Sequence, residues 1–336
     1  MMLHSRKLRS LGKRNLVEAI STEDRIVGCL LGGALGDAWG GPFEGATSPV
    51  HFEIPTQPAL SDDTQLTLAT CESILERCCV DPENIASHFL RWFREGRIHG
   101  IGSSTLKAMR DLAAGVHWAL AGGRGEYSAG NGAAMRIAPL AFLLNTSEPG
   151  DRSLIRDVCR ITHHNDEAYV GALAIVMAIR SVIEGTWPRH RNFLDVVVNS
   201  IPDSAVRDRV QQLLPLRLSA IEVASHFGAT GYVVDTVPLA LYCAQSIAAQ
   251  PLQAVLAETI GAGGDTDTIA SIAGQLAGAV VGAAGIPDDV FARIKDSDQV
   301  RLLAQEFAKF IATQGLYASP PSTIPTPPTF PPSATT

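Results

Sequence analysis

Residues 261–278, GAGGDTDTIASIAGQLAG, constrain the fold of this chain more than any other segment. Small residues lead into a cluster of two carboxylates and two hydroxyls, Asp265 to Thr268, and an apolar run spaced by Ala, Ser and Gly follows. This order predicts a glycine turn that opens a helix. Small side chains along such a helix would let its neighbours pack tightly against it.

The acidic start of this predicted helix has two explanations. In the first, Asp267 or Thr268 is the N-cap, and its side-chain oxygen accepts a backbone N–H of the first turn. In the second, the clustered oxygens bind a hard divalent cation, because Asp and Thr oxygens suit magnesium or manganese better than zinc. Taken alone, the motif favours the cap.

A second acidic cluster, SDDT at residues 61–64, precedes another run with helical spacing. Adjacent carboxylates repel each other, and burying both in ionised form is costly unless a cation lies between them. Two Asp-rich helix starts in one chain therefore favour a metal site over two caps. Asp37 lies near the end of an earlier predicted helix. Glu44 follows it in a glycine-flanked loop, as a solvated acid or as one that can move onto a metal.

Two glycine-rich loops each lead into a predicted helix, at residues 97–105 (RIHGIGSST) and 128–136 (SAGNGAAMR). Such loops can present backbone N–H groups to phosphate, and two of them suggest a ligand with more than one phosphate, although neither matches a Walker or Rossmann fingerprint. His163, in the break between two helices, is either a residue satisfied by the backbone or part of a polar pocket. For Tyr232, burial in the core and stacking on a base are equally supported.

The composition favours closely packed helices, because 46% of residues are hydrophobic while aromatics make up only 6%. We therefore expect an all-α protein. A net charge of −7 argues against nucleic-acid binding. The six cysteines lack zinc-finger and disulfide spacing, which is typical of a reducing, cytoplasmic compartment, and no apolar run approaches the roughly 18 residues that span a membrane.

Three segments are expected. Residues 1–21 form a basic arm, for which a transit peptide is the less favoured interpretation. Residues 22–316 form a single compact domain, which a helix over 288–312 closes. Residues 317–336 are rich in proline and should be extended.

Together these motifs resemble the ADP-ribosylglycohydrolase family, which includes the dinitrogenase-reductase-activating glycohydrolase, over about residues 25–312. The resemblance rests on Gly36-Asp37 with Glu44, on the SDDT and GGDTDT clusters, on residues 130–136 and on Thr162-His163. It implies an all-α fold and a centre of two Mg²⁺ or Mn²⁺ ions. The implied metal ligands are Ser61, Asp62, Asp63, Asp265, Asp267 and Thr268. The implied ADP-ribose contacts are Gly100, Gly102, Ser128, Gly130, Asn131, Gly132, His163 and, with weaker support, Tyr232.

The resemblance implies hydrolysis of the glycosidic bond between ADP-ribose and a modified protein side chain. The cations would clamp the ribose diol and activate a water, with Asp62 or Asp63 orienting it, or Glu44 acting as the base. An arginine linkage is favoured over a serine linkage or O-acetyl-ADP-ribose. Two other classes stay open: a catalytically silent ADP-ribose binder and a phosphohydrolase that yields AMP. A monomer acting on ADP-ribosylated protein is expected.

Overall fold

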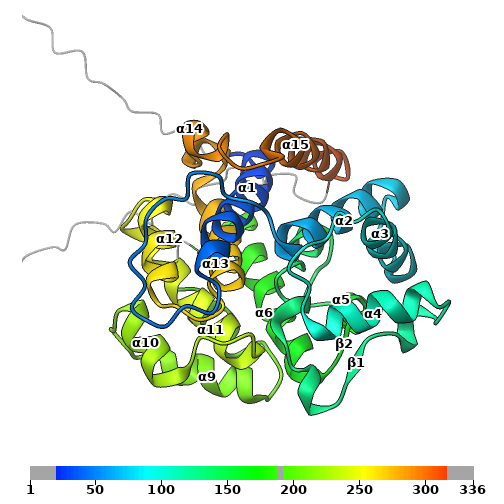
Figure 1. Ribbon diagram of the computed structural model, residues 1–336, viewed down its shortest axis with the longest axis horizontal. Coiled ribbons are helices and arrows are strands. Elements are labelled where there is room, and N and C mark those ends of the chain that lie inside the picture. Colours follow the sequence, from blue (N-terminus) through cyan, green and yellow to red (C-terminus); the bar gives the residue numbers. More distant parts are fainter. Residues whose placement is uncertain (1–19, 188–191, 316–336) are drawn as a thin grey trace, which may run out of the picture.

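The computed structural model describes residues 20–187 and 192–315, and it is an all-α domain, as predicted (Figure 1). The expected tail at 317–336 and nearly all of the expected basic arm at 1–21 lie outside the described residues. The described strands are two residues long, β1 (Gly123–Arg124) and β2 (His163–His164), and they pair in parallel. None of the helices in this part of the chain is both long and apolar enough to cross a bilayer.

The centre of the domain is a pair of helices, α1 (Thr22–Gly40) and α13 (Thr266–Val281), that cross at backbone contact (Figure 1). Glycines from both helices form the contact. A Cβ on Gly32 would overlap the carbonyl of Gly274, and a Cβ on Gly28 would overlap that of Gly278. The small residues of α13 therefore serve the close packing that the sequence predicts for residues 261–278, and the glycines of α1 match them.

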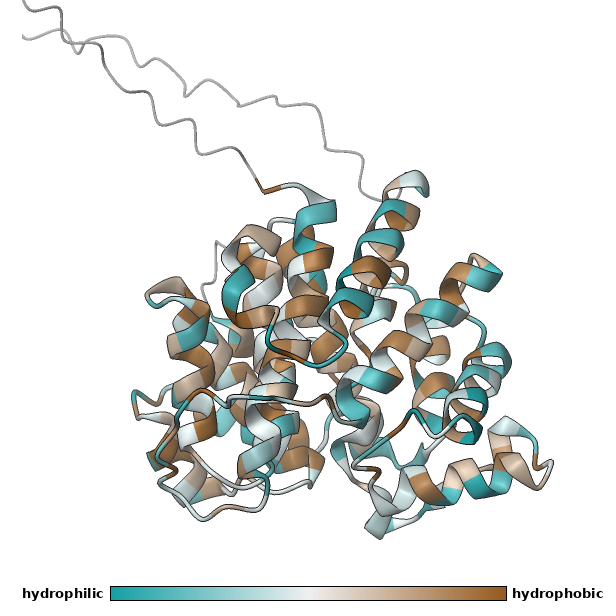
Figure 2. Cartoon of the chain, turned by 45° about the horizontal axis from the view of Figure 1, so that its top comes forward, coloured by the Kyte–Doolittle hydropathy of each residue, from teal (hydrophilic) through white to brown (hydrophobic). Residues whose placement is uncertain are grey.

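The remaining helices surround this pair, with α6 between two peripheral groups (Figure 1). Their hydrophobic residues recur with helical spacing and turn inward, as with Ile85, Phe89 and Trp92, and the outer faces are hydrophilic (Figure 2).

The α-helices are α2 (Asp62–Arg77), α3 (Pro82–Arg94), α4 (Ser103–Ala113), α5 (Pro149–Arg160), α6 (Asp166–Ile183), α8 (Phe193–Val197), α9 (Ala205–Leu213), α10 (Ala220–Phe227), α11 (Val233–Ala244), α12 (Leu252–Gly261), α14 (Asp288–Phe291) and α15 (Ser297–Thr313). Short 3₁₀ helices are η1 (Gly41–Phe43), η2 (Trp118–Leu120), η3 (Glu126–Ser128), η4 (Asn131–Ala133), η5 (Ala138–Phe142), η6 (Gln245–Ala248) and η7 (Ala283–Gly285).

Two helix predictions need correction. The closing helix expected over 288–312 is two helices, α14 and α15, and the chain between them includes Asp296 with a left-handed φ of 64°. That conformation is incompatible with a continuous right-handed helix. The glycine loop at 128–136 leads into the 3₁₀ turns η4 and η5 rather than into an α-helix.

The α1–α13 contact yields a stability prediction. Gly32→Ala should lower the free energy of unfolding by about 3 kcal/mol, because the methyl group must push apart two backbones that cannot rearrange locally. Gly150→Ala is the matched control: its Cβ meets nothing within 4 Å in α5, so it should leave stability unchanged or raise it by about 0.5 kcal/mol. Denaturant unfolding of both variants measures the difference. Equal midpoints would contradict the assigned contact.

Candidate active site

The start of α2 is fixed to α1 by one buried carboxylate, Asp37. Its oxygens accept hydrogen bonds from the backbone N–H groups of Ser61 and Thr64, both at 3.1 Å, and from both hydroxyls, with Ser61 Oγ at 2.7 Å. Ser61 is also the N-cap of α2, since its Oγ accepts the N–H of Asp63 at 3.3 Å. Asp37 therefore sets the position from which Asp62 and Asp63 extend.

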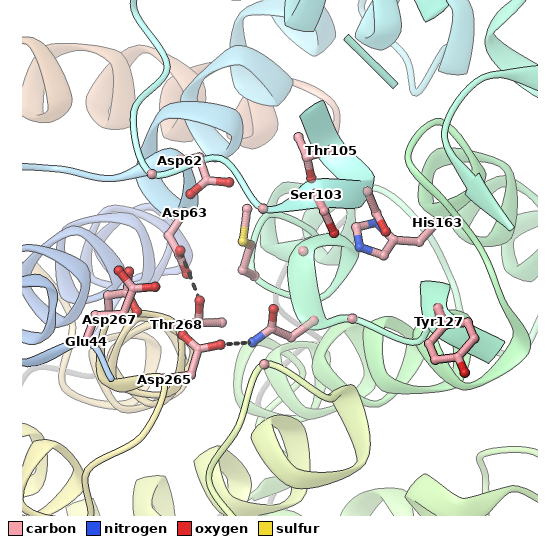
Figure 3. A pocket seen from close by; sticks show the side chains of 18 residues that line it. Glu44, Asp62, Asp63, Ser103, Thr105, Tyr127, His163, Asp265, Asp267 and Thr268 are labelled. Atoms are coloured by element: carbon pink, nitrogen blue, oxygen red, sulfur yellow. Dashed lines mark hydrogen bonds between the residues drawn. The ribbon is translucent and has the colours of Figure 1, made fainter. Parts of the chain in front are cut away.

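The start of α13 lacks the side-chain cap that its motif favours when taken alone. Its N-cap is Asp265, and no side chain makes a capping hydrogen bond there. Asp267 and Thr268 lie inside the first turn of α13, so neither of them is its N-cap. Asp265 Oδ2 instead accepts a hydrogen bond from Asn131 Nδ2 at 2.7 Å, and Thr268 Oγ1 donates to Asp63 Oδ2 at 3.1 Å. The two acidic helix starts thus meet (Figure 3).

The acidic helix starts and both glycine loops share one cavity of about 220 Å³ (Figure 3). Of the predicted site residues, those that line it are Glu44, Asp62, Asp63, Gly100, Gly102, Gly130, Asn131, Gly132, His163, Asp265, Asp267 and Thr268. Residues not predicted for the site complete the lining: Ser103, Ser104, Thr105, Tyr127, Met135 and Gly231.

Three predicted site residues lie beside the cavity without lining it: Ser61, Ser128 and Tyr232. Ser61 lies against Asp37, and Ser128 is buried in η3. Tyr232 is 44% exposed, and its backbone pairs with that of Gly130. The ligand roles of these three residues stay predictions.

Backbone hydrogen bonds join the loops around the cavity into one framework. The segment carrying Glu44 bonds to the glycine turn before α13, from Gly45 N to Gly264 O at 2.8 Å and from Gly264 N to Ala46 O at 2.9 Å. The next residue, Asp265, donates its N–H to Ala229 O at 2.8 Å. The 229–233 segment continues the framework to the second glycine loop, since Asn131 N donates to Gly231 O at 3.0 Å. Segments far apart in sequence are therefore positioned together.

The carboxylates on the acidic side have strongly perturbed protonation. Burial raises the pKa of Asp62 and Asp63 well above the usual range, and repulsion from Asp37 adds to it. Burial, contact with Asp265 and repulsion from Glu44 and Asp37 raise the pKa of Asp267 to about 9. A cation bound among these carboxylates would stabilise their ionised forms and lower the raised pKa values.

Two buried oxygens in this cluster, Asp63 Oδ1 and Asp267 Oδ1, have no hydrogen-bond partner in the structure. Unpaired buried carboxylate oxygens are rare and need a ligand or water. Within residues 20–187 and 192–315, however, no three His, Cys, Asp or Glu side chains form a group arranged to hold a metal ion. The metal ligands therefore stay a prediction.

The opposite side of the cavity offers neutral hydrogen-bond donors. Gly102 is the N-cap of α4 without a side-chain cap, so the first N–H groups of this helix and the hydroxyls of Ser103 and Thr105 face the ligand space (Figure 3). His163 lies over the second glycine loop, where a Cβ on Gly132 would be 2.9 Å from its Cε1. Burial and the charge of Arg136 lower the pKa of His163 to about 3, so the ring is neutral at physiological pH.

Sequence reasoning missed Asp37 as an organising residue and Tyr127 as a lining residue. Tyr127 is fully exposed and lies at the cavity end beyond His163 (Figure 3). A tyrosine within the glycine-rich stretch at 122–132 was the available signal, because an exposed aromatic on a loop indicates binding more often than packing.

Comparison with known proteins gives consistent matches. The ADP-ribosylglycohydrolase family model matches residues 18–316. The chain is 29% identical to ADP-ribosylhydrolase ARH3 of Danio rerio, with 81% of this chain and 86% of that protein covered. It is 28% identical to ADP-ribosylarginine hydrolase Tri1 of Pseudomonas putida (84% and 77% covered), and 26% identical to the ADP-ribosyl-[dinitrogen reductase] glycohydrolase of Rhodospirillum rubrum (88% and 98%).

A solved structure, titled ADP-ribosylglycohydrolase-related protein complex, superposes with a TM-score of 0.68 at 27% identity. The match covers 87% of this chain and 99% of that one. The family match spans nearly all of the described residues, and the all-α fold agrees with it. The chain belongs to the ADP-ribosylglycohydrolase family.

Proposed function

We propose that this protein is a metal-dependent hydrolase that cleaves the glycosidic bond between ADP-ribose and a modified protein side chain, with arginine as the favoured side chain. One observation carries the proposal: two acidic helix starts and two glycine loops, which are spread along the chain from Asp62 to Thr268, line the same cavity. Acids and backbone donors in one cavity suit a ligand that joins a sugar to phosphates. The names of the three relatives compared above are those of ADP-ribosyl hydrolases, and they support the same chemistry.

The donor set fits two Mg²⁺ or Mn²⁺ ions, because these cations prefer carboxylate and hydroxyl oxygens. The unpartnered oxygens of Asp63 and Asp267 and the raised pKa values of the buried acids support this fit. Bound there, such ions would supply Lewis-acid polarisation of a water molecule and of ribose hydroxyls. Residues that would hold them are Ser61, Asp62, Asp63, Asp265, Asp267 and Thr268.

Asp62 is the carboxylate best placed to orient the attacking water and take its proton. Its oxygens are not committed to another side chain, whereas Asp63 accepts a hydrogen bond from Thr268. Glu44 is the alternative base, because its exposed side chain also lines the cavity. The glycine loops and His163 would hold the diphosphate and ribose at the donor side.

Asp267→Asn should abolish release of ADP-ribose from a modified protein, because it removes a charge needed to hold the cations. Chelation of divalent metal should have the same effect, and added Mg²⁺ or Mn²⁺ should raise the melting temperature of the wild type more than that of the variant. Asp298→Asn, on the exposed face of α15, is the control and should behave as the wild type in both assays. Full turnover by the chelated enzyme would disprove metal dependence.

Product analysis separates the three classes of function. A glycohydrolase releases intact ADP-ribose, a phosphohydrolase yields AMP, and a silent binder retains ADP-ribose without turnover. We expect ADP-ribose alone, measured by chromatography of the reaction. AMP as the product would overturn the proposal.

Arginine- and serine-linked ADP-ribosyl proteins and O-acetyl-ADP-ribose, offered in parallel, identify the bond that is cut. We expect the largest kcat/KM for the arginine linkage, because the chain carries the SDDT form and the GYVV segment at 231–234 on which the arginine preference rests. A relative from Pseudomonas putida bears the name of an arginine-linkage hydrolase. A larger kcat/KM for the serine linkage would reverse the assignment.

Tyr127 and Tyr232 form a matched pair for locating the adenine. Tyr127 lines the cavity and Tyr232 does not, and stacking of a base on an aromatic ring is worth about 1–3 kcal/mol. Tyr127→Ala should therefore raise the Kd for ADP-ribose about tenfold, while Tyr232→Ala changes it less than twofold, both by calorimetry. A larger increase in Kd for Tyr232→Ala than for Tyr127→Ala would assign the stacking of the base to Tyr232.

A further inference from the structure

Three buried polar side chains, joined by hydrogen bonds, connect the core with the donor side of the cavity. Arg136 Nη2 donates to Thr162 Oγ1 at 2.7 Å, and Thr162 Oγ1 lies 2.7 Å from His163 Nδ1. Arg136 and Thr162 are 1% and 0% exposed, and His163 is 4% exposed. No carboxylate of the described residues bonds to Arg136, whose other recorded hydrogen bond goes to the carbonyl of Gly132. This series of hydrogen bonds therefore ends at the His163 ring.

The donor properties of these groups determine where each hydrogen lies. A guanidinium has only donors, so the hydroxyl oxygen of Thr162 must accept from Arg136. Among the described residues, Nδ1 of His163 is the one remaining polar atom within hydrogen-bond distance of Thr162 Oγ1. If Nδ1 carried a proton, the Thr162 hydroxyl hydrogen would be buried without an acceptor. The hydroxyl thus donates to Nδ1, and the ring hydrogen is on Nε2.

The surrounding backbone fixes the ring so that Nε2 lies on the cavity side. β2, which contains His163, pairs with β1, and Gly123 N donates to Thr162 O at 3.0 Å. On the other face, a Cβ added to Gly130 would be 3.2 Å from Nε2. The ring is thus held between the strand pair and the glycine loop, and it points into the cavity (Figure 3).

We propose that Thr162, oriented by Arg136, is a positioning residue that fixes His163 as the neutral Nε2–H tautomer, so that the ring presents one hydrogen-bond donor to a phosphate or ribose oxygen of the ligand. The identity of that ligand rests on the proposed function, whereas the tautomer does not. The neutral His163 ring can donate a hydrogen bond to the ligand in a fixed direction. A protonated ring would instead place a second positive charge beside Arg136. Its pKa of about 3 agrees with this state.

The test uses the wild type, Thr162→Val and Thr162→Ser. It combines ¹⁵N NMR of the histidine-labelled, ligand-free proteins with calorimetry of ADP-ribose binding. In the wild type, the His163 signal, assigned by its loss in His163→Asn, should show hydrogen on Nε2 and an accepting Nδ1. Thr162→Val should give a mixture of tautomers and raise the Kd for ADP-ribose about fivefold, the effect of one weakened hydrogen bond. Thr162→Ser keeps the hydroxyl and should restore both the single tautomer and the affinity.

Hydrogen on Nδ1 in the wild type would overturn the proposal, as would a wild-type spectrum and affinity in Thr162→Val. A melting curve for each variant separates misfolding from the predicted local change, and Thr162→Ser keeps the test valid if the valine variant unfolds. If the wild type fails to bind ADP-ribose, the proposed function fails, while the tautomer assignment is still decided by the NMR of the ligand-free protein.

Discussion

The site depends on the close approach of α1 and α13 at their glycines. The approach stays close up to the point where the site begins: a Cβ on Gly40, the last residue of α1, would overlap the backbone of Thr266 and Asp267, and Thr266 Oγ1 donates to the carbonyl of Gly40 at 2.8 Å. Because Asp37 is one turn earlier on α1 and holds the start of α2, the spacing of the two helix axes sets the spacing of the acids. A looser packing would separate the acidic clusters before it exposed the core.

This packing forces together carboxylates that would separate in free solution. Each is buried near another of like charge, and the pKa directions of Asp62, Asp63 and Asp267 all record that the ionised forms are destabilised. The energy that holds them comes from elsewhere, from the apolar core and from the hydrogen bonds of Asp37. Burying these carboxylates close together lowers the stability of the fold but forms a site that can bind a cation or ligand. Such a loss of stability is common at functional sites.

The sequence predicted the all-α fold and the pairing of SDDT with GGDTDT, because helical spacing and acidic helix starts are local signals. It also related the small residues of the segment 261–278 to close packing. The cap that the 261–278 motif favours when taken alone is not formed, and local sequence could not show this, because the Thr268 hydroxyl bonds to Asp63, 205 residues away in the chain. The role of Asp37 in holding α2, and Tyr127 as a lining residue, were missed for the same reason. A buried aspartate in a helix and a tyrosine in a loop acquire their roles only from what the tertiary fold places beside them.

The division of the cavity bears on which bond is attacked. The acids lie on one side of the cavity and the neutral donors Ser103 and His163 on the other (Figure 3). Asn131, in the second glycine loop, donates a hydrogen bond to Asp265. A phosphate group gains hydrogen bonds on the donor side, so the proposed function places the diphosphate of the ligand with the helix start of α4 and His163. The acids, which can activate water, are then left beside the sugar that continues from the diphosphate. That arrangement supports the proposed attack at the anomeric carbon of the ribose, and it is the physical reason to favour glycoside hydrolysis over cleavage between the phosphates.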